Sequence, residues 1–150
     1  MYSQQEYFSE RFFARDDRFV GTGRVAMTWE LDGRRISQFQ RRYKKFAKSN
    51  EQEVLNCFEN LQRVLDGLNE GASLGELVFL HKEGQGLFAC DQHGPGKVKK
   101  ELRLYFYPDE DEERIYVLQI GDKSTQQEDI KACRELIASI RADASESDTD

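Results

Sequence analysis

One stretch of the chain, residues 97–140, constrains the fold most, because it contains in succession the patterns of a strand, a turn, a second strand and a helix. Over residues 102–107 leucine and phenylalanine alternate with arginine and tyrosine, which is the two-residue period of a strand with one apolar face. Pro108 and Asp109 then predict a turn, since proline cannot donate to a sheet ladder and aspartate favours turns. Residues 114–120 are rich in β-branched side chains and apolar on both faces, which predicts a second strand near the middle of a sheet.

The same stretch ends in a predicted helix that follows Gly121, where we expect the second strand to end. Ser124 and Gln127 have the spacing of a capping box, in which each side chain accepts a hydrogen bond from the other residue's backbone N–H. Four apolar residues then fall on one helical face, namely Ile130, Cys133, Ile137 and Ile140. This face predicts that the helix packs back onto the sheet.

The preceding part of the chain predicts a strand and two helices. Residues 24–31 alternate apolar and polar side chains, and this strand either stands alone before the helices or pairs with residues 34–37 as a hairpin. Residues 36–48 and Glu51–Asn69 carry apolar residues at helical spacing, and Gly71 is placed to end the second helix. Together they predict an αα-hairpin.

Two further strands are predicted at residues 77–82 and 86–91. The order strand, two helices, four strands and helix predicts an α+β fold, with a mostly antiparallel sheet, a preceding αα-hairpin on one side and a C-terminal helix. We expect residues 24–141 to form this domain, residues 1–23 to be an appendage, and the acidic residues 142–150 to be a disordered tail.

Length and composition fit an ordinary globular protein. The 150 residues are enough for one domain with its own core. No segment approaches the ~20 apolar residues of a membrane span, and the N-terminus lacks the basic-then-apolar order of a signal peptide. We therefore expect a cytoplasmic protein without membrane contact.

The three cysteines, Cys57, Cys90 and Cys133, are widely spaced and predicted to be buried rather than bridged or metal-bound.

The charge is unevenly distributed along the chain. The net charge is −6, but residues 1–50 hold eleven basic and six acidic residues, which gives +5. An acidic protein is not expected to bind nucleic acid broadly, although a local basic site remains open. The helix at residues 36–48 has such a basic face, with Arg41, Arg42, Lys44, Lys45 and Lys48. This face is either a solvated surface or a contact for an acidic protein or an RNA backbone, whose binding would weaken steeply with salt.

The candidate site is a group of cations, because no phosphate-binding glycine loop, HExxH or G-x-S-x-G motif occurs. Its members are Lys97, Lys99, Lys100, Arg103 and Lys123. If the two strands pair antiparallel, Arg103 and Lys123 lie at the same edge of the sheet. Clustered cations suit a phosphate, since they stabilise charge that develops in the transition state. The alternative is that they form ion pairs with Glu101 or Asp122.

The two histidines are predicted differently. His93 lies in a glycine- and proline-containing loop beside the lysines, and is either incidental or part of the cationic site. His81 lies within a predicted strand next to Leu80, where a structural role is expected.

The order of segments resembles a known family. A lysine-rich segment is followed by L-R-L-Y-F-Y, a polar turn, I-Y-V-L-Q-I-G-D-K, and a helix that opens T-Q-x-x-D-I. This resembles the RelE/HigB-type toxins of bacterial type II toxin–antitoxin systems, closely over residues 97–140 and not at all over the N-terminal residues. The resemblance implies a RelE-like fold and a ribosome-dependent mRNA endoribonuclease that inhibits translation and is neutralised by an antitoxin protein.

The resemblance also implies roles for particular residues. Arg103 and Lys123 would hold the scissile phosphate, assisted by Lys97 or Lys99, while the ribose 2′-OH attacks without a metal or cofactor. From their positions in the sequence we expect Lys97, Lys99 and His93 to complete this site. This sequence departs from the family in two ways. It is acidic overall, and near the last helix it has Gln126, Gln127, Glu128 and Asp129 where the family often has tyrosine or histidine. The alternatives are a non-enzymatic interaction module on the same fold and a ParE-like toxin directed at DNA gyrase.

Overall fold

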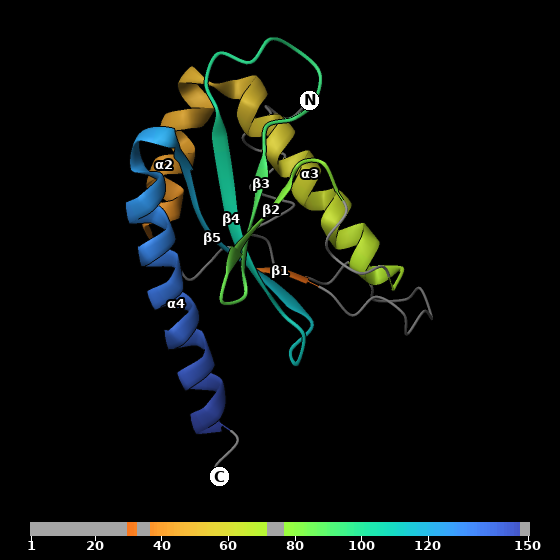
Figure 1. Cartoon of the computed structure of the whole chain (residues 1–150), viewed down its shortest axis with the longest axis vertical. Helices are drawn as coiled ribbons and strands as arrows, with labels where there is room; N and C mark the ends of the chain where they lie inside the picture. The colour runs from red at the N-terminus through yellow and green to blue at the C-terminus, as the bar shows by residue number, and fades with distance from the viewer. Residues whose placement is uncertain (1–29, 33–36, 72–76, 148–150) are drawn as a thin grey trace.

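The computed structural model describes residues 30–32, 37–71 and 77–147, and has an α+β fold, as predicted (Figure 1). Two helices precede a four-stranded antiparallel sheet, a short parallel strand is added at one edge, and a long helix follows. The elements are β1 (Glu30–Asp32), α2 (Ser37–Ser49), α3 (Glu51–Asn69), β2 (Leu80–Gly84), β3 (Leu87–Asp91), β4 (Leu102–Asp109), β5 (Arg114–Asp122), the 3-10 helix η1 (Lys123–Thr125) and α4 (Gln126–Ser147).

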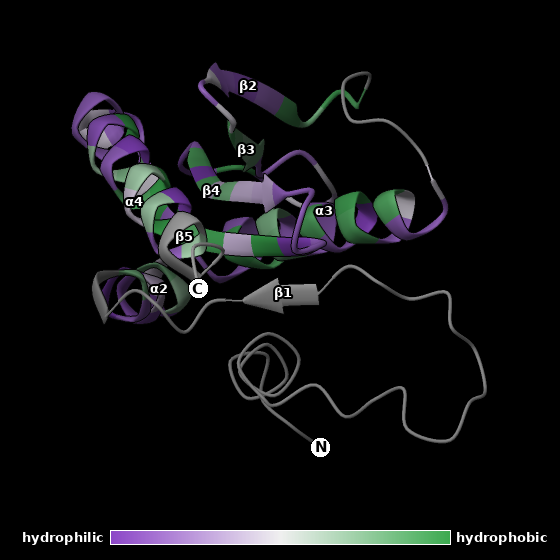
Figure 2. Ribbon diagram, turned by 90° about the horizontal axis from the view of Figure 1, so that it is seen from below, coloured by the Kyte–Doolittle hydropathy of each residue, from purple (hydrophilic) through white to green (hydrophobic). Residues whose placement is uncertain are grey.

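The strands are ordered β1-β5-β4-β3-β2, with β1 parallel to β5 and every other pair antiparallel. The central hairpin of β4 and β5 pairs Leu104 with Ile120, which confirms the predicted pairing. α3 packs against β3 and β4, and α4 packs against β5 and β3, so that the two helices lie on either side of the sheet (Figure 2). Figure 2 also colours most of the edge strand β2 as hydrophilic.

The β2–β3 turn uses an unusual backbone. Gly84, Gln85 and Gly86 all have positive φ angles, of 87°, 58° and 86°. Glycine adopts this left-handed conformation without steric cost, so the glycines flanking Gln85 allow the tight reversal. The strands themselves begin later than the sequence predicts, at Leu80 and Leu87, because Leu77 already accepts a backbone hydrogen bond from Leu80 in a turn.

The predicted strand end at Pro108 is wrong, because β4 continues through Pro108 to Asp109. β3 pairs with β4 only as far as Phe106. Beyond Phe106, β4 has β5 on one side alone, so a residue without an N–H is tolerated there as on an edge strand. The turn is made by Asp109, whose Oδ1 accepts hydrogen bonds from the backbone N–H groups of Asp111 and Glu112, at 3.1 and 3.3 Å. Gly121 likewise lies inside β5 rather than at its end.

The start of the last helix also differs from the prediction. Asp122, rather than Ser124, is the cap: its Oδ1 accepts a hydrogen bond from the backbone N–H of Ser124 at 3.0 Å. A turn of 3-10 helix follows, and α4 begins at Gln126. α4 then runs to Ser147, well into the stretch that the sequence predicted as a disordered tail.

Asp122→Ala is expected to lower the free energy of unfolding by about 1 kcal/mol, the usual effect of losing a helix cap. The hydrogen bond from the Ser124 hydroxyl, followed by one from Lys100, lowers the pKa of Asp122. A lowered carboxyl pKa contributes stability above the unfolded-state value of about 4, and this contribution is lost as the pH falls through the folded-state value. Urea unfolding at pH 7 and pH 3 measures both effects: the difference between wild type and Asp122→Ala should be smaller at pH 3.

The two N-terminal helices follow their predicted pattern. α3 spans the predicted residues, and Gly71 has φ +83° after its end, as expected of a helix-terminating glycine. α2 is Ser37–Ser49 where residues 36–48 were predicted, and buries Phe39, Tyr43 and Phe46. Of the strand predicted at residues 24–31, only Glu30 and Leu31 lie within the described residues, and they form part of β1. The predicted appendage, residues 1–23, lies outside the described residues.

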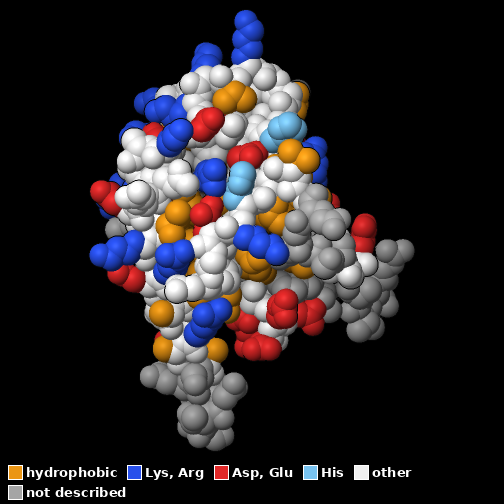
Figure 3. All heavy atoms as spheres, in the orientation of Figure 1, with side chains coloured by type: hydrophobic (Ala, Val, Ile, Leu, Met, Phe, Trp, Pro, Cys, Tyr) orange, Lys and Arg blue, Asp and Glu red, His pale blue; other side chains and the backbone are white. Residues whose placement is uncertain are grey.

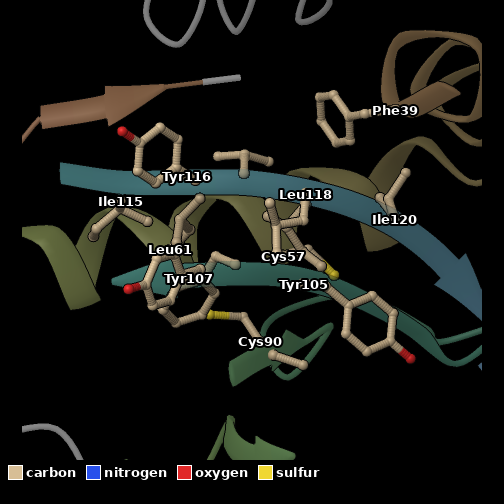
Figure 4. Close-up of a cluster of buried hydrophobic side chains, with 14 of the residues drawn as sticks. Phe39, Cys57, Leu61, Cys90, Tyr105, Tyr107, Ile115, Tyr116, Leu118 and Ile120 are labelled. Atoms are coloured by element: carbon tan, nitrogen blue, oxygen red, sulfur yellow. The ribbon is translucent and has the colours of Figure 1, made fainter. Parts of the chain in front are cut away.

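The core lies between α3 and the sheet, as Figure 4 shows. It includes Phe58, Leu61, Leu104 and Ile120, all fully buried. It also includes Cys133, Ile137 and Ile140 of α4. The three cysteines are buried and unbridged, as predicted. Burial, aided by the nearby charge of Asp129, raises the pKa of the Cys133 thiol to about 12, so this cysteine packs as a neutral apolar side chain. No helix in the described part of the chain is both long and apolar enough to cross a bilayer.

Candidate functional site

A polar cluster lies on the face of the sheet that packs against α4. Because side chains alternate along a strand, the leucines of β4 point towards α3 while Arg103 and Tyr105 point to the opposite face. The strand register places Asp91 beside Arg103 and aligns His81 with Tyr105 across β3. Figure 3 shows histidine and charged side chains of both signs gathered near the middle of this view of the molecule.

His81 and Asp91 form a pair across β2 and β3. The Nε2 atom of His81 lies 2.8 Å from Oδ2 of Asp91, and 32% of the His81 side chain is exposed. The second oxygen of Asp91 accepts a hydrogen bond from the backbone N–H of His93, also at 2.8 Å. This carboxylate is therefore held in place, and it can orient the imidazole. The sequence predicted a structural role for His81, whereas the structure gives it a carboxylate partner and access to solvent.

Arg103 lies next to this pair and is itself paired. Its Nη1 atom lies 2.8 Å from Oε1 of Glu83, and 30% of the arginine side chain is exposed compared with 14% of the glutamate. The backbone oxygen of Glu83 accepts a hydrogen bond from Arg134 of α4, so the β2 end of the pair is anchored. A carboxylate thus occupies part of the position that a phosphate would take on Arg103. A guanidinium has five N–H donors, so binding sites remain on it beside the glutamate.

Tyr105 supplies the least expected member of the cluster. Its ring is fully buried, and its hydroxyl has no hydrogen-bond partner among the described residues. Figure 4 shows this hydroxyl pointing away from the other labelled side chains. Burial, with the charges of Asp129 and Glu83, raises the pKa of Tyr105 far above its ordinary value, so the group stays protonated. An unpaired buried donor is costly, and this hydroxyl is closed off from solvent by the residues around it.

The structure does not keep the predicted cationic group together: its members contact different elements at the end of the sheet. Lys123 begins η1, two residues after Gly121, the register partner of Arg103, so both lie at the same end of the β4–β5 pair as expected. Lys100 pairs with the end of β5, where its Nζ atom lies 3.4 Å from Oδ2 of Asp122, and it also reaches α2, 5.9 Å from the centroid of the Phe46 ring. Lys97, Lys99 and His93 are exposed on the loop at residues 92–101.

The predicted basic face of α2 loses one member. Arg41, Lys44, Lys45 and Lys48 are exposed, but Arg42 is turned inwards. The Nη1 atom of Arg42 lies 2.6 Å from Oδ1 of Asp129, a carboxylate whose side chain is only 3% exposed, and it also reaches Thr125 and the backbone oxygen of Ile120. Gly121 leaves room for this pair, since a Cβ atom there would lie 2.1 Å from Asp129 Oδ2. Arg42 thus ties α2 to α4 and is not available to a partner.

Arg42→Ala is expected to lower the free energy of unfolding by about 3 kcal/mol, because it leaves the buried Asp129 carboxylate without its cation. The exposed neighbour provides a matched control: Arg41→Ala should change stability by less than about 0.5 kcal/mol. Urea denaturation of both variants measures the difference. Equal stabilities would contradict the assignment of Arg42 to the interior.

The sequence did not indicate the pairs His81–Asp91 and Arg103–Glu83. Each joins residues on different strands, so it depends on register, and the β2–β3 register shifts between Lys82 and Gly84. The alternation of β4 could have placed Tyr105 beside Arg103, but nothing in it indicated an unpaired hydroxyl.

The cluster brings together groups for phosphoryl chemistry. A histidine–aspartate pair can take up a proton, and an arginine can bind an anion. The described residues contain no group of three or more histidine, cysteine or acidic side chains placed to hold a metal ion. Comparison of the chain with protein-family models, curated proteins and solved structures finds no match.

Proposed function

We propose that this chain is the toxin of a toxin–antitoxin pair, a ribosome-dependent mRNA endoribonuclease that inhibits translation and is neutralised by an antitoxin. The observation that carries the proposal is the placement of the His81–Asp91 pair beside Arg103 on one face of the sheet. This set combines a proton acceptor with a phosphate-binding cation, as cleavage by a ribose 2′-OH requires. It also contains Arg103, which the sequence resemblance assigns to the scissile phosphate.

In the proposed reaction His81 removes the proton of the 2′-OH adjacent to the scissile phosphate. The 2′-oxygen forms a bond to phosphorus, the bond from phosphorus to the 5′-oxygen breaks, and the leaving oxygen takes up a proton from water. The products are a 2′,3′-cyclic phosphate and a 5′-hydroxyl. Arg103 stabilises the negative charge on the phosphate oxygens, and Lys123 adds positive charge at the same end of the sheet.

Glu83 affects how this site would bind its substrate. Its carboxylate contacts Arg103 through a single nitrogen, so the remaining guanidinium donors are open to a phosphate. The negative charge of Glu83 nevertheless opposes an incoming phosphate. Phosphate binding is therefore favoured when Arg103 releases Glu83 and binds the phosphate instead, because the guanidinium can then donate two parallel hydrogen bonds to the phosphate oxygens.

One observation favours a second candidate, a non-enzymatic interaction module. Arg103 is neutralised by Glu83, and Lys100 is paired with Asp122, so two cations of the predicted site already have partners within the chain. A module of this kind would bind its partner without cutting RNA.

The deciding experiment combines the purified chain with bacterial ribosomes that carry a short defined mRNA in the A site. The expected result is cleavage within the A-site codon, with a 2′,3′-cyclic phosphate on the upstream fragment. A matched mRNA with a single 2′-deoxy nucleotide immediately before the cut should remain intact, because it lacks the nucleophile. If the unmodified mRNA also remains intact, the ribonuclease assignment fails and the interaction module takes its place.

A further inference from the structure

We infer that the exposed cations of α2 and of the loop at residues 92–101 form a single surface that binds the RNA phosphate backbone, apart from the cluster around Arg103. We call this the basic surface, and its members are Arg41, Lys44, Lys45, Lys48, Lys97, Lys99 and Lys100. The inference rests on the proposed function in that the ligand is the same RNA. Figure 3 shows basic side chains projecting from the top of the molecule, where Figure 1 places the loop.

Phe46 joins the two segments of the basic surface. The Nζ atom of Lys45 lies 5.6 Å from the centroid of the Phe46 ring, and the Nζ atom of Lys100 lies 5.9 Å from the same centroid. Both distances are within the range of a cation–π contact. Lysines that are far apart in the sequence, one on α2 and one on the loop, are thereby brought side by side.

Two buried asparagines on α3 fix the position of the loop. The side-chain nitrogen of Asn56 donates to the backbone oxygens of Gln92 and Pro95, at 3.1 and 3.0 Å. That of Asn60 donates to the backbone oxygens of Asp91 and His93, at 3.0 and 2.9 Å. Because these hydrogen bonds order the backbone in the absence of a ligand, the loop lysines are held near α2 before RNA arrives, which lowers the entropy lost on binding.

The loop also packs closely on α3. A Cβ atom at Gly94 would lie 2.9 Å from the side chain of Asn56, and one at Gly96 would lie 2.9 Å from that of Gln52. The two glycines therefore let the loop backbone approach the helix closely enough for the asparagine contacts.

The chemistry of the basic surface fits a phosphate backbone better than a protein. Protein interfaces are depleted in lysine and have an apolar centre, whereas the only large apolar side chain exposed on the described part of this loop or of α2 is Val98. Within the described residues, Lys100 is the one cation of this surface that pairs with an acid. Lysines that keep their charge accessible bind phosphates and release counterions.

The basic surface and the cluster around Arg103 meet at the end of the β4–β5 strand pair. Lys100 contacts Asp122, and Asp122 is the register partner of Leu102, which precedes Arg103. An RNA strand lying on the lysines would thus continue towards the end of β4. On this assignment Lys97 and Lys99 hold the strand and do not stabilise the transition state.

The test is binding of a single-stranded 2′-O-methyl oligonucleotide, which cannot be cleaved, measured by fluorescence anisotropy over a range of salt concentrations. For single strands the slope of log K against log salt is ~0.7 per phosphate contact. The triple variant Lys44→Gln, Lys45→Gln, Lys99→Gln should therefore have a slope smaller in magnitude by about 2. The control Lys131→Gln, an exposed lysine on α4, should match the wild type, and thermal unfolding confirms that all variants fold.

The outcomes separate this inference from the proposed function. An unchanged slope in the triple variant overturns the inference, even if the wild type cuts RNA. Wild-type binding that depends on these lysines, without cleavage of ribosome-bound mRNA, supports the inference and removes the proposed ribonuclease activity. If polyglutamate binds through these lysines and the oligonucleotide does not, the partner is an acidic protein, such as an antitoxin segment, and the inference is overturned.

Discussion

Arg103→Ala is expected to lower the rate of mRNA cleavage about a hundredfold or more, the usual effect of losing one contact to the charge of a transition state. The side chain is partly exposed at the sheet end, so the loss should occur in a folded protein. Arg103→Lys should also be impaired, because a lysine cannot bind a phosphate through two parallel hydrogen bonds. Single-turnover cleavage on ribosomes, with stability measured in parallel, provides the result.

Glu83→Gln is the companion variant, and its effect should be opposite. It preserves the shape and the hydrogen-bonding oxygen that contacts Arg103 but removes the negative charge that opposes a phosphate. RNA binding should become tighter, although stability falls slightly with the loss of the ion pair.

If Arg103→Ala combined with Lys123→Ala leaves cleavage and growth inhibition intact, these cations do not bind the scissile phosphate and the ribonuclease assignment fails.

The secondary structure was predictable wherever one strong local pattern decided it. The apolar period of Glu51–Asn69 predicts α3, and the alternation of β4 predicts its pairing with β5. The errors arose where the arrangement of neighbouring strands determines the local structure. Pro108 is tolerated in β4 only because β3 does not extend beside it. Asp122 caps the 3-10 helix η1 that precedes α4, because β5 ends at Asp122, one residue after Gly121.

The candidate site was predictable only in part, for a related reason. Backbone pairing put Arg103 and Lys123 at one end of the sheet, as the sequence indicates. The spacing of these residues in the sequence does not predict in which direction each side chain points. Arg103 turns to Glu83 on the α4 side, whereas Lys100 turns to Asp122 and Phe46 on the α2 side, so a group that is compact in the sequence becomes two surfaces.

The proposed role of His81 makes the second large prediction. His81→Gln should lower cleavage by about 10²- to 10⁴-fold, the range for loss of a general acid or base, with little change in RNA binding. Single-turnover cleavage on ribosomes and binding of an uncleavable oligonucleotide, measured side by side, separate the two effects. His93→Gln is the matched control, since His93 is exposed and contacts Asp91 only through its backbone. If His93→Gln were the variant that lost cleavage, the base would lie on the loop and not on β2.

Asp91 acts on this chemistry through His81 and is therefore a positioning residue. Asp91→Asn keeps a hydrogen-bonding oxygen but removes the carboxylate that fixes the orientation of the His81 ring. The maximum rate of cleavage should therefore fall, while RNA binding should change little. Urea unfolding measured in parallel separates this role from a merely structural one. A loss of rate at unchanged stability supports the positioning role of Asp91, and a loss of stability with an unchanged rate contradicts it.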